Sequence, residues 1–112
     1  MNTTKIIRRI PSETFKNLIV KFDGKIYLSS HCFDHFSLAQ RKLFTESELK
    51  HIVIKQNPEG IGLQRNGRYA VFYKRKEGYL RVICEVKRGK FEIITFLNTI
   101  SIPNLSRIEN EK

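Results

Sequence analysis

Residues 60–99 decide the fold, and they read GIGLQRNGRYAVFYKRKEGYLRVICEVKRGKFEIITFLNT. Three turn sequences, Asn66-Gly67, Lys76-Glu77-Gly78 and Arg88-Gly89, divide this stretch into runs of alternating character. Glycine favours such turns because it adopts positive φ without steric cost. Tight turns between successive strands make the neighbours antiparallel, so the sequence predicts a four-stranded antiparallel meander. The predicted strands are residues 61–65, 68–75, 79–86 and 90–97.

The alternation within these strands predicts which side of the sheet is buried, because successive side chains of a strand point to opposite faces. In the third predicted strand, one side is entirely apolar. Its members are Leu80, Val82, Cys84 and Val86. The other side carries Arg81, Ile83, Glu85 and Lys87. For the last strand the same rule places Phe91, Ile93, Thr95 and Leu97 on one side and Glu92, Ile94 and Phe96 on the other. We expect one face to pack against helices and the other to stay polar.

Two helices are expected before the meander. Ser29 and Ser30 are good N-cap residues for a helix over 31–43, which has an apolar side and a side with histidines and basic residues. A second helix begins at Thr45-Glu46-Ser47-Glu48, which has the pattern of a capping box, and it ends at Asn57-Pro58.

The N-terminal part predicts a hairpin. Residues 18–22 and 25–28 are two apolar runs, and Asp23-Gly24 between them is a favoured hairpin turn. Residues 1–14 are expected to form an edge strand or a loose arm. The predicted fold is α+β: two N-terminal helices on one face of a four-stranded antiparallel sheet, with an N-terminal hairpin or arm. We expect a single domain over 1–112, with its core in 17–98 and a tail in 99–112.

Charge narrows the range of functions. The chain has 21 Lys and Arg against 11 Asp and Glu, for a formal net charge of +10. Residues 61–90 alone hold nine bases and two acids. Such a surface attracts polyanions, although a solvated face tuned for solubility has the same composition. With no apolar run of transmembrane length, we expect a cytoplasmic protein without membrane contact. Cys32 and Cys84 lack metal-site spacing, and no cofactor is expected.

The candidate catalytic residues are His31, His35, Arg81 and Glu85. Cleavage of RNA without a metal needs proton transfer and stabilisation of charge on the phosphorus. Arg81 and Glu85 lie four apart on one strand and share a face. They could act as phosphate ligand and base, or they could belong to a weak surface ion pair across neighbouring strands. His31 and His35 lie four apart on a helix, where they could transfer protons, bind phosphate or be ordinary surface histidines. A metal site would need a third ligand, and no motif supplies one.

Further residues are candidates for RNA contact through charge or stacking. They are Arg41, Lys42, Arg68, Tyr69, Tyr73, Lys74, Arg75 and Lys87. Tyr69 and Tyr73 have the even spacing that would let them stack on unpaired bases, although half-buried tyrosines are also common in sheets.

The order of these elements resembles a small domain family of mobile elements. The similarity covers residues 25–97, with Ser29-Ser30-His31 before a helix, Gly67-Arg68-Tyr69 opening a strand, and residues 80–86 (LRVICEV) in the next. That family is grouped with the RelE-like and BrnT-like toxins in the barnase/colicin/RelE-type ribonuclease fold. The resemblance implies a metal-independent endoribonuclease, often neutralised by an antitoxin. His31 matches the family's helix-start histidine and Arg81 its strand arginine, whereas His35 stands where the family usually has arginine.

The leading hypothesis is therefore a toxin-type endoribonuclease that cleaves mRNA or tRNA through a basic sheet face. One alternative is a nucleic-acid-binding module without catalysis. Another is a viral or plasmid-borne protein-interaction factor whose basic patch meets an acidic partner.

Overall fold

A computed structural model describes residues 3–32 and 45–103. The helices are α1 (Ser12–Lys21) and α3 (Glu46–Lys55). The strands are β1 (Ile6–Arg9), β2 (Ile26–Leu28), β3 (Gly60–Gln64), β4 (Tyr69–Lys74), β5 (Tyr79–Lys87) and β6 (Lys90–Thr99).

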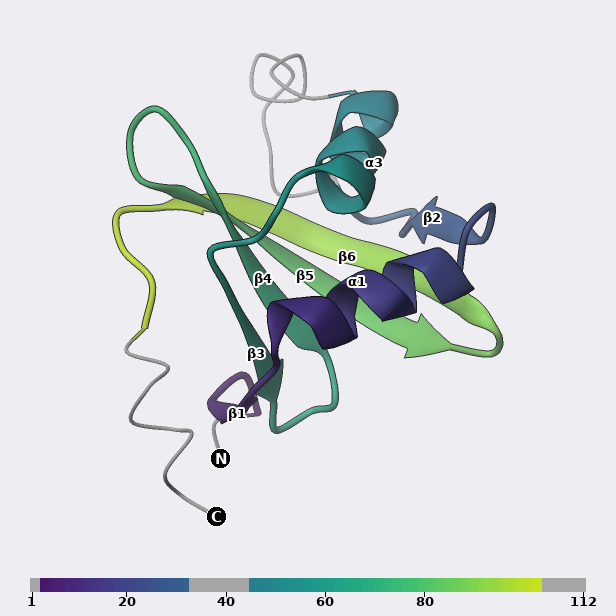
Figure 1. Cartoon of the computed structure of the whole chain (residues 1–112), viewed down its shortest axis with the longest axis horizontal. Helices are drawn as coiled ribbons and strands as arrows, with labels where there is room; N and C mark the ends of the chain where they lie inside the picture. Colours follow the sequence, from purple (N-terminus) through teal and green to yellow (C-terminus); the bar gives the residue numbers. More distant parts are fainter. Residues whose placement is uncertain (1–2, 33–44, 104–112) are drawn as a thin grey trace.

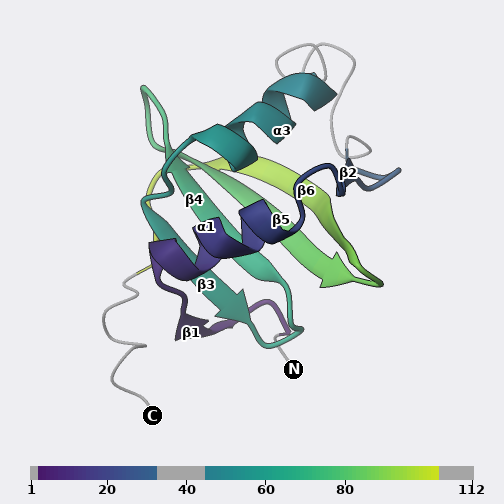
Figure 2. The same ribbon diagram turned by 45° about the vertical axis from the view of Figure 1, so that its right-hand side comes forward.

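All six strands form one sheet in the order β1-β3-β4-β5-β6-β2. Neighbours are antiparallel except β2 and β6, which run parallel with Ile26 opposite Phe91. Both helices lie on the same face of this sheet (Figures 1 and 2). Because β1 and β2 form opposite edges, the N-terminal third of the chain borders the C-terminal meander on both sides.

The predicted sheet and helix order are wrong, although the α+β class holds. The sheet has six strands and is mixed. The two described helices are not an N-terminal pair, because strand β2 lies between them in the chain. α1 precedes β2, and α3 lies between β2 and β3. β1 matches the edge strand that is one of the two expectations for residues 1–14, and β2 lies within the apolar run 25–28. The local turn sequences did not reveal that these strands pair with β3 and β6, because pairing across long sequence separations leaves no local pattern.

The predicted hairpin over 18–28 is also wrong, because its first half is the end of α1. Phe15, Leu18, Ile19 and Phe22 recur at helical spacing and form the side of α1 that packs on the sheet. Gly24 adopts φ +78° as the third residue of the turn after the helix, which the Lys25 amide closes by donating to the Phe22 carbonyl at 2.8 Å. Asp23-Gly24 thus connects a helix to β2, which pairs with β6 instead of folding back on residues 18–22.

α3 confirms the second predicted helix. The Thr45 hydroxyl accepts a hydrogen bond from the Glu48 amide, and the Glu48 carboxylate accepts one from the Thr45 amide, both at 3.1 Å. Leu49, Ile52 and Val53 are buried against the sheet. Of the helix predicted over 31–43, His31 lies in a turn after β2, and residues 33–44 lie outside the described part of the chain.

The meander is confirmed with all three turns. At the β5–β6 turn, Arg88 and Gly89 have φ values of +53° and +76°, the two positive values that a type I′ hairpin requires. β6 departs from the predicted alternation because Ile83 pairs with Thr95 whereas Cys84 pairs with Ile93. This bulge at Ile94 reverses the faces, so Phe96 joins the core and Leu97 is exposed, opposite to the simple period of two.

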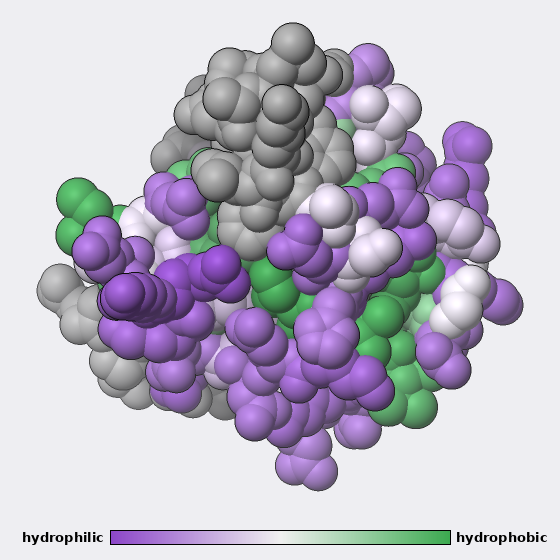
Figure 3. Space-filling view, turned by 90° about the horizontal axis from the view of Figure 1, so that it is seen from above, coloured by the Kyte–Doolittle hydropathy of each residue, from purple (hydrophilic) through white to green (hydrophobic). Residues whose placement is uncertain are grey.

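The main core lies between the helices and the sheet. It includes Phe15, Leu49, Val71, Val82 and Phe91, and Phe15 meets Phe91 edge to face at 6.0 Å between ring centroids. Apolar side chains also reach the surface, and the view from above shows apolar patches between hydrophilic areas (Figure 3). Neither helix of residues 3–32 and 45–103 has the length and apolar composition that crossing a bilayer requires.

Candidate nucleic-acid interface

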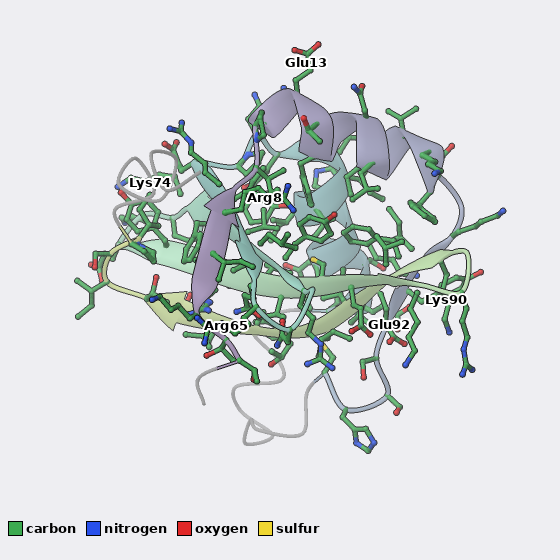
Figure 4. The ribbon with its side chains drawn as sticks, turned by 90° about the horizontal axis from the view of Figure 1, so that it is seen from below. Arg8, Glu13, Arg65, Lys74, Lys90 and Glu92 are labelled. Carbon is green, nitrogen blue, oxygen red and sulfur yellow. The ribbon has the colours of Figure 1, made fainter. Side chains whose placement is uncertain are left out.

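The side of the sheet turned away from α1 and α3 is called the open face here. The pairing register places on it the side chains that alternate with the core residues of β4, β5 and β6. Its charged residues are Arg68, Lys74, Arg81, Glu85, Lys87, Lys90 and Glu92. Within residues 3–32 and 45–103 no helix covers this face, and Figure 4 shows Glu92 on the side of the sheet opposite α1. Five bases against two acids make the open face positive.

The centre of the open face is apolar. Ile6, Ala70, Phe72 and Ile83 form a second buried cluster there, and Ile102, after the end of β6, packs on it. Gly62 makes this packing possible, because a Cβ at that position would lie 2.5 Å from Cγ2 of Ile6. The charged residues consequently fall into two groups, one toward each end of the strands.

The first group is built on an ion pair. Nε of Arg68 donates to Oε2 of Glu85 at 3.2 Å, across the register between the start of β4 and β5. Glu92 of β6 is directly opposite Glu85, and like charges so placed repel. Arg68 relieves this repulsion on one carboxylate. The group therefore places the Arg68 guanidinium between solvent and the half-buried Glu85 carboxylate. The guanidinium can bind a phosphate, and the carboxylate can accept a proton.

Lys87 and Lys90 extend the first group toward the β5–β6 turn, where they are opposite each other. Tyr27 of the edge strand β2 is opposite Glu92, and Nζ of Lys90 lies 5.7 Å from the centre of its ring. The Tyr27 side chain is 45% exposed. Nζ of Lys50, from α3 on the helix side, lies 6.0 Å from the same ring, so Tyr27 stands at the sheet edge between two cations. An exposed ring in this position can stack a base while the Lys90 ammonium contacts phosphate.

The second group surrounds Arg81. Its guanidinium lies 5.6 Å from the ring centre of Phe72, and its Nε is buried without a hydrogen-bond partner. Burial lowers the pKa of Arg81 from its ordinary value, yet guanidinium stays charged in proteins. Lys74, diagonally across the register, has its Nζ 4.8 Å from the Tyr79 ring. This group can accept an anion with little rearrangement.

The structure does not join the predicted pair Arg81 and Glu85. Both are on the open face, but four residues along one strand separate their backbones by roughly 13 Å. The partner of Glu85 is Arg68, and Ile83 of the apolar centre stands between the two groups. Lys74 and Lys87 lie on the open face as RNA contact requires.

The two predicted stacking tyrosines face the helices. Tyr73 is fully buried in the main core, where burial raises the pKa of its phenol and its hydroxyl has no hydrogen-bond partner. Tyr69 is half-buried, with its ring 6.4 Å from that of Phe15 in α1. Neither side chain reaches the open face, where the described tyrosines are Tyr27 and Tyr79, which the sequence interpretation did not single out.

The remaining predicted residues are separate from these two groups or undescribed. His31 is exposed in the turn after β2, where the Ser29 amide donates to the Ile93 carbonyl of β6. Arg75 lies on the helix side and lines a pocket of about 440 Å³ with Glu48 and His51 of α3. His35, Arg41 and Lys42 lie outside the described residues.

The open-face residues that sequence interpretation missed are Tyr27, Tyr79, Lys90 and Glu92. Parity would have found Tyr79 and Lys90, since they share the alternation of Arg81 and Lys87. Parity also places Glu92 opposite the core side of the last strand, whereas Tyr27 needed the parallel pairing of β2 with β6, which no local pattern encodes.

Among the described residues, no three His, Cys, Asp or Glu side chains are grouped in a way that could hold a metal ion. Comparison of the chain with family models, with curated proteins and with solved structures finds no match. The likeness to RelE-type ribonucleases thus stays a prediction from the sequence.

Proposed function

We propose that the protein binds RNA across the open face of its sheet. The observation that carries the proposal is the placement of Arg68, Lys74, Arg81, Lys87 and Lys90 on one side of three adjacent strands, against only two acids. Neutralised phosphates release condensed counterions, and this supplies most of the affinity of such a surface. A face tuned only for solubility would mix both signs of charge more evenly.

The arrangement of the two groups favours a flexible single strand. Phosphates can reach Arg81 and Lys74 at one end and Lys87 and Lys90 at the other, while the apolar centre lies between them. The Tyr79 and Tyr27 rings stand beside the lysines of the two groups, at 4.8 and 5.7 Å. An unpaired strand can place bases on such rings, whereas a duplex keeps its bases stacked internally.

Cleavage is the second candidate, and the Arg68–Glu85 pair favours it. Glu85 can take the proton of a ribose 2′-hydroxyl while Arg68 holds the adjacent phosphate. His31 lies in the turn after β2, two residues after Ser29, whose amide donates to the Ile93 carbonyl of β6, and is the candidate for supplying the leaving group's proton. The protein would then be a metal-independent endoribonuclease of toxin type, borne by a mobile element and neutralised by an antitoxin, as the sequence resemblance implies.

Binding is tested with a fluorescent 20-nucleotide single-stranded RNA and anisotropy titrations from 50 to 300 mM NaCl. The variant K87S/K90S should bind at least five-fold more weakly at 100 mM salt and lose about 1.4 units of the log–log salt slope, the share of two single-strand phosphate contacts. The control K16S/K55S removes equal charge on the helix side and should bind like the wild type. Equal losses in both variants would mean that net charge alone attracts RNA and would overturn the proposal.

Cleavage is tested by incubating total RNA with the protein in EDTA. Fragments from the wild type and none from Glu85→Gln, with unchanged RNA affinity in both, support the second candidate. Intact RNA in every lane refutes cleavage and leaves the binding proposal as it stands.

A further inference from the structure

A groove separates the two helices on the face opposite to the proposed RNA site. It encloses about 300 Å³ between the flanks of α1 and α3, which lie apart on the sheet (Figures 1 and 2). Phe15 and Ile19 of α1 and Val53 of α3 form its apolar lining, and Pro58 closes one end. The walls are regular helices packed on the sheet, so the groove is a preformed feature.

Two aliphatic side chains at the groove stay in contact with water. Val20 of α1 is 74% exposed and Ile54 of α3 is 40% exposed, and both line the groove. Single exposed aliphatic residues are ordinary on protein surfaces. Here they belong to two different helices and border one apolar concavity, which is the pattern of an interaction surface.

The charge at the groove has one sign. Lys16 of α1 and Lys55 of α3 line it, and no acidic residue does. The acidic residues of α3 are at its other end, where Glu46 pairs with Lys50 at 3.1 Å and Glu48 completes the capping box. A partner that fills the apolar lining must therefore bring carboxylates to the rims.

We propose that this groove binds an acidic amphipathic helix of another protein. Apolar side chains at positions i, i+3 or i+4, and i+7 of that helix would lie between Val20 and Ile54, as in other helix-in-groove complexes. Glutamates or aspartates on its flanks would face Lys16 and Lys55. The groove and the open face are on opposite sides of the sheet, so the proposal does not depend on the RNA proposal, and both ligands can bind together.

The probe is a fluorescein-labelled 18-residue peptide with leucines at i, i+3, i+4 and i+7 spacing and glutamates on its other positions. A scrambled peptide of the same composition and a peptide with lysine for glutamate are its controls. With the full chain at 100 mM NaCl, the acidic amphipathic peptide should bind at least ten-fold more tightly than either control. Equal binding of the scrambled peptide, or no binding of the amphipathic one, overturns the proposal.

Variants locate the binding on the groove. Val20→Glu, at an exposed position, and K16E/K55E should each weaken peptide binding at least ten-fold. K87S/K90S should bind the peptide like the wild type, which separates this site from the open face. Circular dichroism checks that Val20→Glu folds. Peptide affinity unchanged in the groove variants would refute the site. Dimerisation of the wild type that Val20→Glu abolishes would assign the groove to a second copy of this chain instead.

Discussion

Arg81 illustrates how one residue on this sheet differs from its neighbours. Its planar guanidinium can lie over the Phe72 ring, which a lysine ammonium does less well, and guanidinium is the more weakly hydrated of the two cations. The buried Nε without a partner is a donor that a phosphate oxygen could satisfy. The Arg81 guanidinium therefore keeps a donor that can bind an anion, whereas the Arg68 guanidinium is already paired with the Glu85 carboxylate.

At the residue scale, the free energy of unfolding should fall in alkaline solution, because unfolding lets the buried thiols lose their protons. Burial, with a smaller effect from the Glu46 carboxylate, raises the pKa of Cys32 to about 11 from its ordinary value of 9.0. The folded state therefore holds this proton more tightly than the unfolded state does. The stabilisation is complete below pH 9 and is lost as the pH rises from 9 to 11.

The measurement is urea unfolding of the wild type and Cys32→Ala at pH 8, 9 and 10 in the presence of a reductant. Burial also raises the pKa of Cys84, so the variant keeps part of the alkaline loss. Between pH 8 and 10 the wild type should lose about 1 kcal/mol more than Cys32→Ala. Parallel pH profiles for the two proteins would contradict the assignment.

The pairing of charged residues was predictable only in part. Strand parity placed Arg81, Glu85 and Lys87 on one face, and the structure agrees. The partner of Glu85 is set by the register of β4 against β5, which depends on the length of the intervening turn. Sequence spacing shows which residues share a face, but only the register shows which of them touch.

At the scale of elements, α3 depends on its N-terminal cap. The described α3 has ten residues, too few for a stable isolated helix, so packing and capping must hold it. Its cap satisfies two backbone amide donors, those of Thr45 and Glu48, at the point where the chain enters the helix.

Thr45→Ala removes the oxygen that accepts the Glu48 amide and should lower the free energy of unfolding by about 1 kcal/mol. Thr45→Ser keeps an acceptor and should stay within about 0.5 kcal/mol of the wild type. Urea unfolding at neutral pH measures both changes. A serine variant as unstable as the alanine variant would show that the Thr45 methyl group matters and that the hydroxyl does not.

Elements that a few neighbouring residues encode were predicted, whereas elements that depend on pairing between distant segments were not. The capping box of α3 and the three hairpin turns are encoded within a few residues. The Asp23-Gly24 pair is equally local but ambiguous, because a glycine with positive φ serves hairpins and helix ends alike. The helical spacing of Phe15, Leu18, Ile19 and Phe22 is the pattern that distinguishes a helix from a hairpin at this place.

At the scale of the whole molecule, the sheet separates two surfaces for which we propose different ligands. One carries the helices and the groove, and the other carries the open face. Bases lie on both surfaces, Lys16 and Lys55 at the groove and five more on the open face, and they contribute to the formal charge of +10. Charge of one sign on both sides destabilises the compact state through self-repulsion.

Salt should therefore stabilise the fold while it weakens RNA binding. Raising NaCl from 10 to 300 mM should raise Tm by roughly 3 to 5 °C, because screening reduces the self-repulsion. The exposed pair Lys50–Glu46 and the partly exposed pair Arg68–Glu85 lose little, since such pairs contribute under about 1 kcal/mol each. Calorimetry with NaCl and KCl measures the shift. A fall in Tm would mean that attractive pairs outweigh the repulsion.

The parallel pairing of β2 with β6 has a consequence for synthesis on the ribosome. Ile26 leaves the exit tunnel long before its partner Phe91 has been translated. Until then β2 has no strand to pair with. The preceding helix α1 also lacks most of the sheet that buries Phe15 and Ile19. Because contacts so distant in sequence are slow to form, the sheet reaches its final topology only after β6 has been translated. Nascent chains that stall before β6 is translated would expose the apolar side of α1 and the unpaired strand β2 to chaperones and proteases.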